Sequence, residues 1–257
     1  MTDAHPTLLA QLSDPHVRVG RNDREPAAAL SEAVRAVIAL NPRPHAAIVS
    51  GDLVQSASAR AYERVRELLA PLPMPVFVLA GNHDDRDGLR EYFALDTPTG
   101  AVGEPFRYTA RVRDLRLVVA DTTRPGREEG ALDFERRAWI EAELAAEPAM
   151  PTILAIHHPP IAIGIRPLDE IGLPETDRAA LGDLLALRPH VRRVIAGHVH
   201  RGAFGVLGGC GVVTCPSTHL QAPLEIPGDE LHLYPEPAGF ALHALVDGEL
   251  VTHIQPV

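Results

Sequence analysis

Short apolar runs alternate with longer amphipathic stretches through the first two hundred residues of the chain. Six runs, over residues 8–14, 46–52, 76–82, 115–122, 152–158 and 192–198, each hold 4–6 apolar residues, as strands buried on both faces do. The stretches between them place apolar residues at helical spacing and predict helices over 26–40, 58–69, 132–144 and 175–187. This alternation predicts an α/β fold with a largely parallel sheet.

The pattern changes after Gly202. Short apolar segments at 203–207, 211–215, 240–246 and 250–254 follow one another with turns and no helix, which predicts antiparallel strands of a second sheet packed on the first. A proline-rich segment, 216–239, separates them and predicts a long loop of the kind that often carries function. No stretch has the composition of a linker. We therefore expect a single domain over residues 1–257, with 203–257 completing the second sheet.

Composition excludes several classes of protein. The chain has 257 residues, 46% hydrophobic and 23% charged, which suits a globular domain with a large core. All 24 basic residues are arginine, and the absence of lysine excludes a P-loop lysine, a Schiff-base lysine and a Ser-Lys nucleophile pair. A net charge of −10 and 4% aromatic content argue against a nucleic-acid polymer as partner.

Cysteine content and the start of the chain indicate the compartment. Cys210 and Cys215 are too few for a zinc ribbon or a disulfide framework. The first residues lack a basic and apolar leader, and no run approaches the ~18 apolar residues of a membrane helix. We expect a cytoplasmic protein with no membrane partner.

Five of the apolar runs end in side chains that bind metals. Because the carboxyl ends of parallel strands meet at one edge of a sheet, we expect these side chains to converge there. Glycines at 51, 81 and 197 are expected to let the backbone turn sharply. The candidate ligands are Asp14, His16, Asp52, Asn82, His157, His198 and His200.

Seven ligands exceed the needs of one ion and suit two ions that share a bridging carboxylate. Oxygen and imidazole donors without thiolate favour Mn or Fe, with Zn or Co as alternatives, as two divalent or trivalent ions. Adjacent ions are suited to phosphoryl chemistry and leave the pocket positive, so that an anionic phosphodiester is attracted despite the acidic surface.

The short sequence motifs that hold these ligands, taken in their order along residues 14–200, resemble those of the calcineurin-like metallophosphoesterases. The resemblance implies a four-layer αββα sandwich of two mixed β-sheets flanked by helices. It implies that one ion takes Asp14, His16, Asp52 and His200. The second ion would take Asp52, Asn82, His157 and His198, with Asp52 bridging.

The resemblance also assigns catalytic and substrate-contacting residues. It implies that His83 contacts the phosphate and protonates the leaving group, so we expect His83 and Asp52 to be catalytic. Neighbouring residues at a strand end point to opposite faces, so only one of His157 and His158 binds a metal directly; the family's spacing favours His157. We expect His158 in a supporting or substrate-contacting role, and His219 as a candidate for the substrate pocket.

Differences between this sequence and related phosphatase families reduce the number of activities that it could have. Gln55 stands where purple acid phosphatases carry a tyrosine, and the sequence around Asp52 lacks the Ser/Thr phosphatase pattern. The chain is most similar to class III cyclic-nucleotide phosphodiesterases and bacterial glycerophosphodiesterases. This implies a dinuclear-metal phosphodiesterase that hydrolyses a small phosphodiester, first a 3′,5′-cyclic nucleotide, by a metal-activated hydroxide. Segments 161–176 and 216–239 are the expected specificity loops.

Other substrates and activities remain possible from the sequence. A glycerophosphodiester is the second substrate, and a broad-specificity phosphomonoesterase or nuclease would need a basic groove that the arginines do not form. A non-catalytic scaffold would have lost ligands. The resemblance also implies a homodimer.

The remaining polar residues near these motifs are expected to have structural roles. Asp84 and Asp85 are expected to cap their loop and Asp121 to close a turn. Arg124, Arg166 and Arg201 are expected to be solvated rather than to hold a phosphate.

Overall fold

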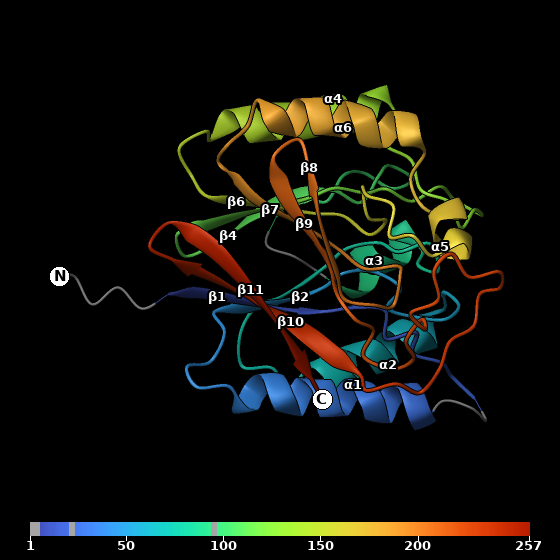
Figure 1. Cartoon of the computed structure of the whole chain (residues 1–257). Helices are drawn as coiled ribbons and strands as arrows, with labels where there is room; N and C mark the ends of the chain where they lie inside the picture. The colour runs from blue at the N-terminus through green and yellow to red at the C-terminus, as the bar shows by residue number, and fades with distance from the viewer. Residues whose placement is uncertain (1–5, 21–23, 94–96) are drawn as a thin grey trace.

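Two mixed β-sheets lie face to face between two layers of helices in the computed structural model (Figure 1). It describes residues 6–20, 24–93 and 97–257. The four-layer αββα sandwich is therefore confirmed. Among the described residues, none of the helices combines the length and apolar character that a membrane-spanning segment requires.

The first sheet has the strand order β11-β10-β1-β2-β3. Its parallel part consists of β1 (Thr7–Leu12), β2 (Ala46–Val49) and β3 (Val76–Val78). β10 (Gly239–Val246) runs antiparallel to β1, and β11 (Glu249–Pro256) forms the edge beside it. The carboxyl ends of β1, β2 and β3 consequently lie at the same edge of the sheet.

The second sheet has the order β4-β5-β6-β7-β9-β8. Its four inner strands are parallel, and the two outer strands are antiparallel to their neighbours. The strands are β4 (Tyr108–Val112), β5 (Leu115–Val119), β6 (Thr152–Ala155), β7 (Val191–Ala196), β8 (Ala203–Leu207) and β9 (Cys210–Thr214).

Each sheet has its own helical layer (Figure 1). The first is covered by α1 (Arg24–Ala39) and α2 (Ala59–Leu69), and the second by α4 (Phe134–Ala146) and α6 (Glu175–Ala186). All four correspond to predicted helices. Two short helices, α3 (Arg86–Tyr92) and α5 (Arg166–Glu170), were not predicted, because their own sequences are largely polar and that of α5 contains a proline.

Alternating side chains explain why the inner strands have nearly continuous apolar sequences. In β5, Leu117 and Val119 pack in the core between the sheets, whereas Val118 packs under the helices. In β6, Ile153 and Leu154 divide in the same way. A strand covered on both faces must be apolar at every position, so alternation of polarity disappears from its sequence.

The last quarter of the chain corrects the expected arrangement. Residues 203–257 do not complete one sheet: β8 and β9 extend the second sheet, while β10 and β11 return to the first. β9 also pairs in parallel with β7, where antiparallel pairing was expected. The edge strand β4 was missed because Arg111 and half-buried positions interrupt its apolar pattern.

His243 of β10 is fully buried between the sheets. Burial and the nearby Arg193 lower the pKa of His243 to about 3. Between pH 6.5 and this value the unfolded chain binds a proton that the native chain does not, so stability falls as the pH falls.

We predict that the free energy of unfolding of His243→Gln depends less on pH than that of the wild type between pH 6.5 and 4. One such histidine contributes a slope of up to about 1.4 kcal/mol per pH unit. Urea unfolding at several pH values measures the slope. The exposed His253 on β11 provides the control, since His253→Gln should retain the wild-type slope. Equal slopes for all three proteins would contradict the prediction.

Candidate metal centre

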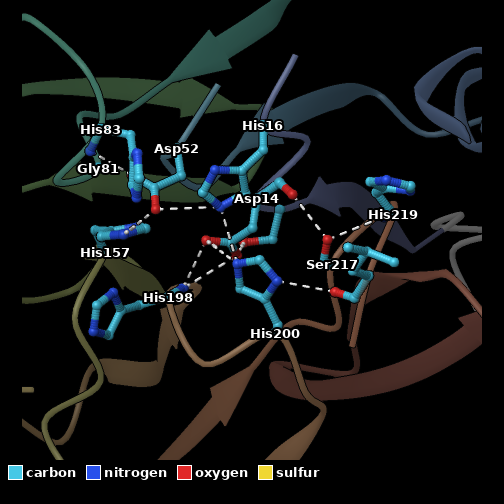
Figure 2. Close-up of polar contacts among 12 residues, drawn as sticks. Asp14, His16, Asp52, Gly81, His83, His157, His198, His200, Ser217 and His219 are labelled. Atoms are coloured by element: carbon cyan, nitrogen blue, oxygen red, sulfur yellow. Dashed lines mark hydrogen bonds and ion pairs between the residues drawn. The ribbon is translucent and has the colours of Figure 1, made fainter. Parts of the chain in front are cut away.

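The seven candidate ligands meet where β1, β2, β3, β6 and β7 end, as Figure 2 shows for most of them. Ligand atoms of Asp14, His16 and His200 lie within 4.8 Å of one another, and so do those of Asp14, Asp52 and His157. Segments up to 184 residues apart in the sequence thus supply one cluster.

Asp52 lies in the middle of the cluster. Its Oδ2 atom is 3.5 Å from Nε2 of His16 on one side and 3.5 Å from Nε2 of His157 on the other. Its Oδ1 atom accepts a 2.9 Å hydrogen bond from the backbone N–H of His83. This is the position that a carboxylate shared by two ions requires.

A donor group lies on each side of Asp52. On one side the Nε2 atoms of His16 and His200 are 3.0 Å apart, and Nε2 of His200 is 3.8 Å from Oδ1 of Asp14. On the other, Oδ1 of Asn82 is 3.1 Å from Nε2 of His157 and 3.1 Å from Nδ1 of His198. Each group combines oxygen with imidazole nitrogen and contains no thiolate, a donor set that suits Mn, Fe or Zn ions.

Backbone carbonyls fix the orientation of three of the histidines. Nδ1 of His157 lies 2.9 Å from Ser50 O, Nδ1 of His200 lies 2.9 Å from Leu220 O, and Nε2 of His198 lies 3.1 Å from Ile171 O. A carbonyl only accepts, so each of these nitrogens carries the hydrogen. In the neutral form of each ring the other nitrogen would be the one available to a metal ion, as in many metal sites.

His158 differs from His157 in this respect. Its Nδ1 is 2.8 Å from the Thr122 hydroxyl and its Nε2 is 2.9 Å from the Glu128 carbonyl, so both nitrogens are occupied. The ring is fully buried and does not line the pocket. The expected substrate contact through His158 is therefore not supported by its position. The ring instead packs against that of His198, with 4.4 Å between the two ring centroids.

Five of the candidate ligands have a left-handed backbone. The φ angles lie between 44° and 69° at Asp14, His16, Asp52, His198 and His200. Among the described non-glycine residues, the only others are Arg113 and Asp247, which occupy hairpin turns. This conformation is unfavourable for side chains larger than glycine. Interlocking loops maintain it, since the N–H groups of Asp14 and His16 donate to the carbonyls of Gly51 and Asp52.

The three glycines next to the ligands serve two purposes. Gly51 has φ +93° and makes the expected turn. The chain also turns at Gly81 and Gly197, where the N–H groups of Asp84 and Val199 donate to the glycine carbonyls, but neither turn uses a positive φ at the glycine. Gly81 and Gly197 are glycine because of close approach: a Cβ atom on Gly81 would overlap the Asp52 carboxylate, and one on Gly197 would overlap the Ser13 hydroxyl.

Burial and the clustered charges shift several pKa values. Burial alone would raise the pKa of Asp52, but His157 and His16 hold it well below its ordinary value. Conversely, burial disfavours a charged His157, yet Asp52 raises the pKa of His157 to about 9. Burial lowers the pKa of His16 to about 3 despite the same carboxylate. The ionised Asp52 is therefore the electrostatic focus of the site.

A pocket of about 700 Å³, open solvent at its mouth included, lies over the cluster. His83 and His219 line it, as expected, whereas Arg166 pairs with Asp229 and Arg201 bonds the Ala222 carbonyl. Arg18 also lines the pocket, and this cation was missed, although it follows His16 by two positions. An apolar wall faces the cluster and consists of Leu168, Ile171, Leu220, Leu231 and Leu233.

Three acidic residues beside the site have the capping roles expected of them. Asp84 accepts hydrogen bonds from the N–H groups of Gly81 and Leu53 and so joins two ligand-bearing loops. Asp85 caps the start of α3. Asp121 closes a turn at the N–H of Thr123 and pairs with the guanidinium of Arg86 at 2.7 Å.

Comparisons with known proteins find matches in both sequence and fold. The family model described as calcineurin-like phosphoesterase matches residues 7–202. A probable cyclic nucleotide phosphodiesterase of Synechococcus sp. is 32% identical over 92% of this chain and 91% of its own. The glycerophosphodiester phosphodiesterase GpdQ of Enterobacter lignolyticus is 31% identical over 84% of this chain and 79% of its own. A dimetal phosphatase from Danio rerio has a similar fold, with TM-score 0.75 and 17% identity over 98% of this chain and 97% of its own.

We predict that Gly81→Ala weakens binding of Mn²⁺ at least tenfold, because the added methyl group displaces the Asp52 carboxylate. Isothermal titration calorimetry of the metal-free protein measures the affinity. Gly202→Ala is the matched control, since its Cβ atom would meet other atoms only at 3.7 Å or more. Equal Mn²⁺ affinities in the two variants would contradict the close-approach argument.

Proposed function

The chain belongs to the calcineurin-like phosphoesterases, and on this premise we propose that it is a metal-dependent phosphodiesterase that hydrolyses a 3′,5′-cyclic nucleotide. The observation that carries the proposal is the pair of donor groups on either side of the Asp52 carboxylate. In this proposal one ion is held by Asp14, His16, Asp52 and His200. The other is held by Asp52, Asn82, His157 and His198.

The donor chemistry supports Mn or Fe at both positions. When bound, two such ions polarise phosphoryl oxygens, offset negative charge and lower the pKa of a bound water. The core supports a single domain, because one continuous cluster contains residues of both sheets, such as Leu9 and Ile153.

His83 is the proposed proton donor to the leaving group. Its Nδ1 atom lies 2.9 Å from the carbonyl of Gln55, which can only accept, so Nδ1 carries a hydrogen. The ring lines the pocket, and a protonated ring would donate through Nε2 to a departing oxygen. The backbone N–H of His83 meanwhile holds Oδ1 of Asp52, so one residue connects proton transfer with the shared carboxylate.

The apolar wall supports a substrate that carries a flat, weakly polar group. A nucleobase can cover Leu231 and Leu233, which are 46% and 40% exposed and face the pocket. A glycerol or choline group would place hydroxyls or a charge against these apolar side chains, which is a less favourable contact. The similarity to GpdQ makes a glycerophosphodiester the second candidate.

We predict that Asp52→Ala abolishes measurable hydrolysis of bis-p-nitrophenyl phosphate in added Mn²⁺, because both donor groups lose their shared ligand. His83→Ala serves as the comparison: it should retain two bound Mn²⁺ ions per chain while kcat falls about 10²–10⁴-fold. Turnover and metal content are measured on the same samples. Wild-type turnover by Asp52→Ala would refute the proposed function.

We predict that Leu233→Ser raises KM for cyclic AMP about tenfold, the equivalent of about 1.4 kcal/mol of lost contact. Hydrolysis of glycerophosphocholine should change little. Leu224→Ser is the matched control, because Leu224 belongs to the same loop, is 65% exposed and does not line the pocket. If the wild type prefers glycerophosphocholine to cyclic AMP in kcat/KM, the second candidate replaces the first.

A further inference from the structure

A line of polar side chains crosses the otherwise apolar space between the sheets. Gln11 and Ser13 at β1, Ser50 after β2 and His243 on β10 are each 0% exposed. Their neighbours include Leu9, Leu12 and other aliphatic side chains of the main core. Polar groups buried this deeply are unfavourable unless hydrogen bonds satisfy them, so their partners require an explanation.

The side chains form one unbroken series of hydrogen bonds. The Thr252 hydroxyl is 2.9 Å from Nδ1 of His243, and Nε2 of His243 is 2.9 Å from Oε1 of Gln11. Nε2 of Gln11 is 2.8 Å from the Ser50 hydroxyl, which is 2.7 Å from the Ser13 hydroxyl. The Ser13 hydroxyl reaches Oδ2 of Asp14 at 2.5 Å. The series therefore runs from the edge of the first sheet to the candidate metal centre.

The direction of each bond follows from the chemistry of the groups. The Gln11 amide nitrogen also lies 3.0 Å from the Ala196 carbonyl, which fixes the amide so that its oxygen faces His243. That oxygen only accepts, so Nε2 of His243 donates. Burial keeps His243 neutral, as its lowered pKa of about 3 indicates, so Nδ1 accepts from Thr252.

The other end is fixed in the same way. The Asp14 carboxylate accepts, so the hydrogen of the Ser13 hydroxyl points toward it. Ser13 must then accept from Ser50, and Ser50 from Gln11. All five bonds thus point the same way, toward Asp14, an arrangement in which each bond polarises the next.

We propose that Gln11, Ser13, Ser50, His243 and Thr252 are positioning residues that orient the Asp14 carboxylate for its metal ion. The inference rests on the proposed function, in which Asp14 is a ligand of one ion only. The Ser13 hydroxyl occupies one lobe of Oδ2, and the backbone N–H of His198 lies 3.0 Å from Oδ1 and 3.1 Å from Oδ2. With these donors in place, rotation of the carboxylate away from His200 breaks hydrogen bonds between groups that are 0% or 5% exposed.

A test is the titration of the metal-free full chain with Mn²⁺ by isothermal titration calorimetry. Ser13→Ala should weaken one of two sites about 10–100-fold, as is typical for loss of such supporting partners, and leave the other site unchanged. Thr252→Val, at the far and partly exposed end, should weaken the same site by a smaller factor. Cys215→Ala is the matched control, because Cys215 is also 0% exposed beside Gln11 but donates to the Gln11 backbone, outside the series.

The outcomes separate this inference from the proposed function. Equal affinities in the wild type, Ser13→Ala and Thr252→Val would overturn the positioning role, and so would a loss at both sites that Cys215→Ala reproduces. If Asp14→Ala retains both Mn²⁺ sites, the proposed ligand set itself is wrong. Loss of one site in Asp14→Ala, and weakening of that same site in Ser13→Ala, would support both.

Discussion

A buried carboxylate stays ionised only where donors or positive charge surround it, and the architecture of this protein meets that requirement for Asp52. The backbone N–H of His83 and the rings of His16 and His157 approach its two oxygens from three different strand ends. These strands must therefore end at one place, with loops short enough to keep their polar residues in contact. The strand order of the first sheet and the glycines that permit close approach meet that geometric requirement.

The same requirement explains why the ligand-bearing loops adopt unfavourable backbone conformations. A regular strand would keep Asp14 and His16 on one face but would carry them past the end of the sheet, about 7 Å apart along the chain. The left-handed residues bend the chain at the strand end, and there the ligand atoms of Asp14, His16 and His200 lie within 4.8 Å of one another. Loop-to-loop hydrogen bonds, such as that from the His16 N–H to the Asp52 carbonyl, hold this conformation in place.

The sequence predicted much of the fold and most of the residues that the structure brings together in the candidate site, for identifiable reasons. Strands buried on both faces leave continuous apolar runs, and their ends mark the sheet edge where Asp14, Asp52 and His157 meet. The return of β10 to the first sheet was not predictable, because short strands joined by turns look alike whichever sheet they join. Arg18, the apolar wall and the series of bonds through His243 also escaped prediction, since they depend on side chains brought together from distant segments.

Polar groups are distributed unequally around the site, and this distribution has an energetic consequence. Behind Asp14, every polar atom in the series from Thr252 to Ser13 has a partner, whereas the ligand atoms themselves face one another across the pocket. Buried imidazoles whose pKa is lowered, such as that of His16, and the five left-handed residues oppose folding of the chain. Ions that bind only the folded chain would offset these terms through linkage, so that metal affinity and native stability depend on the same side chains.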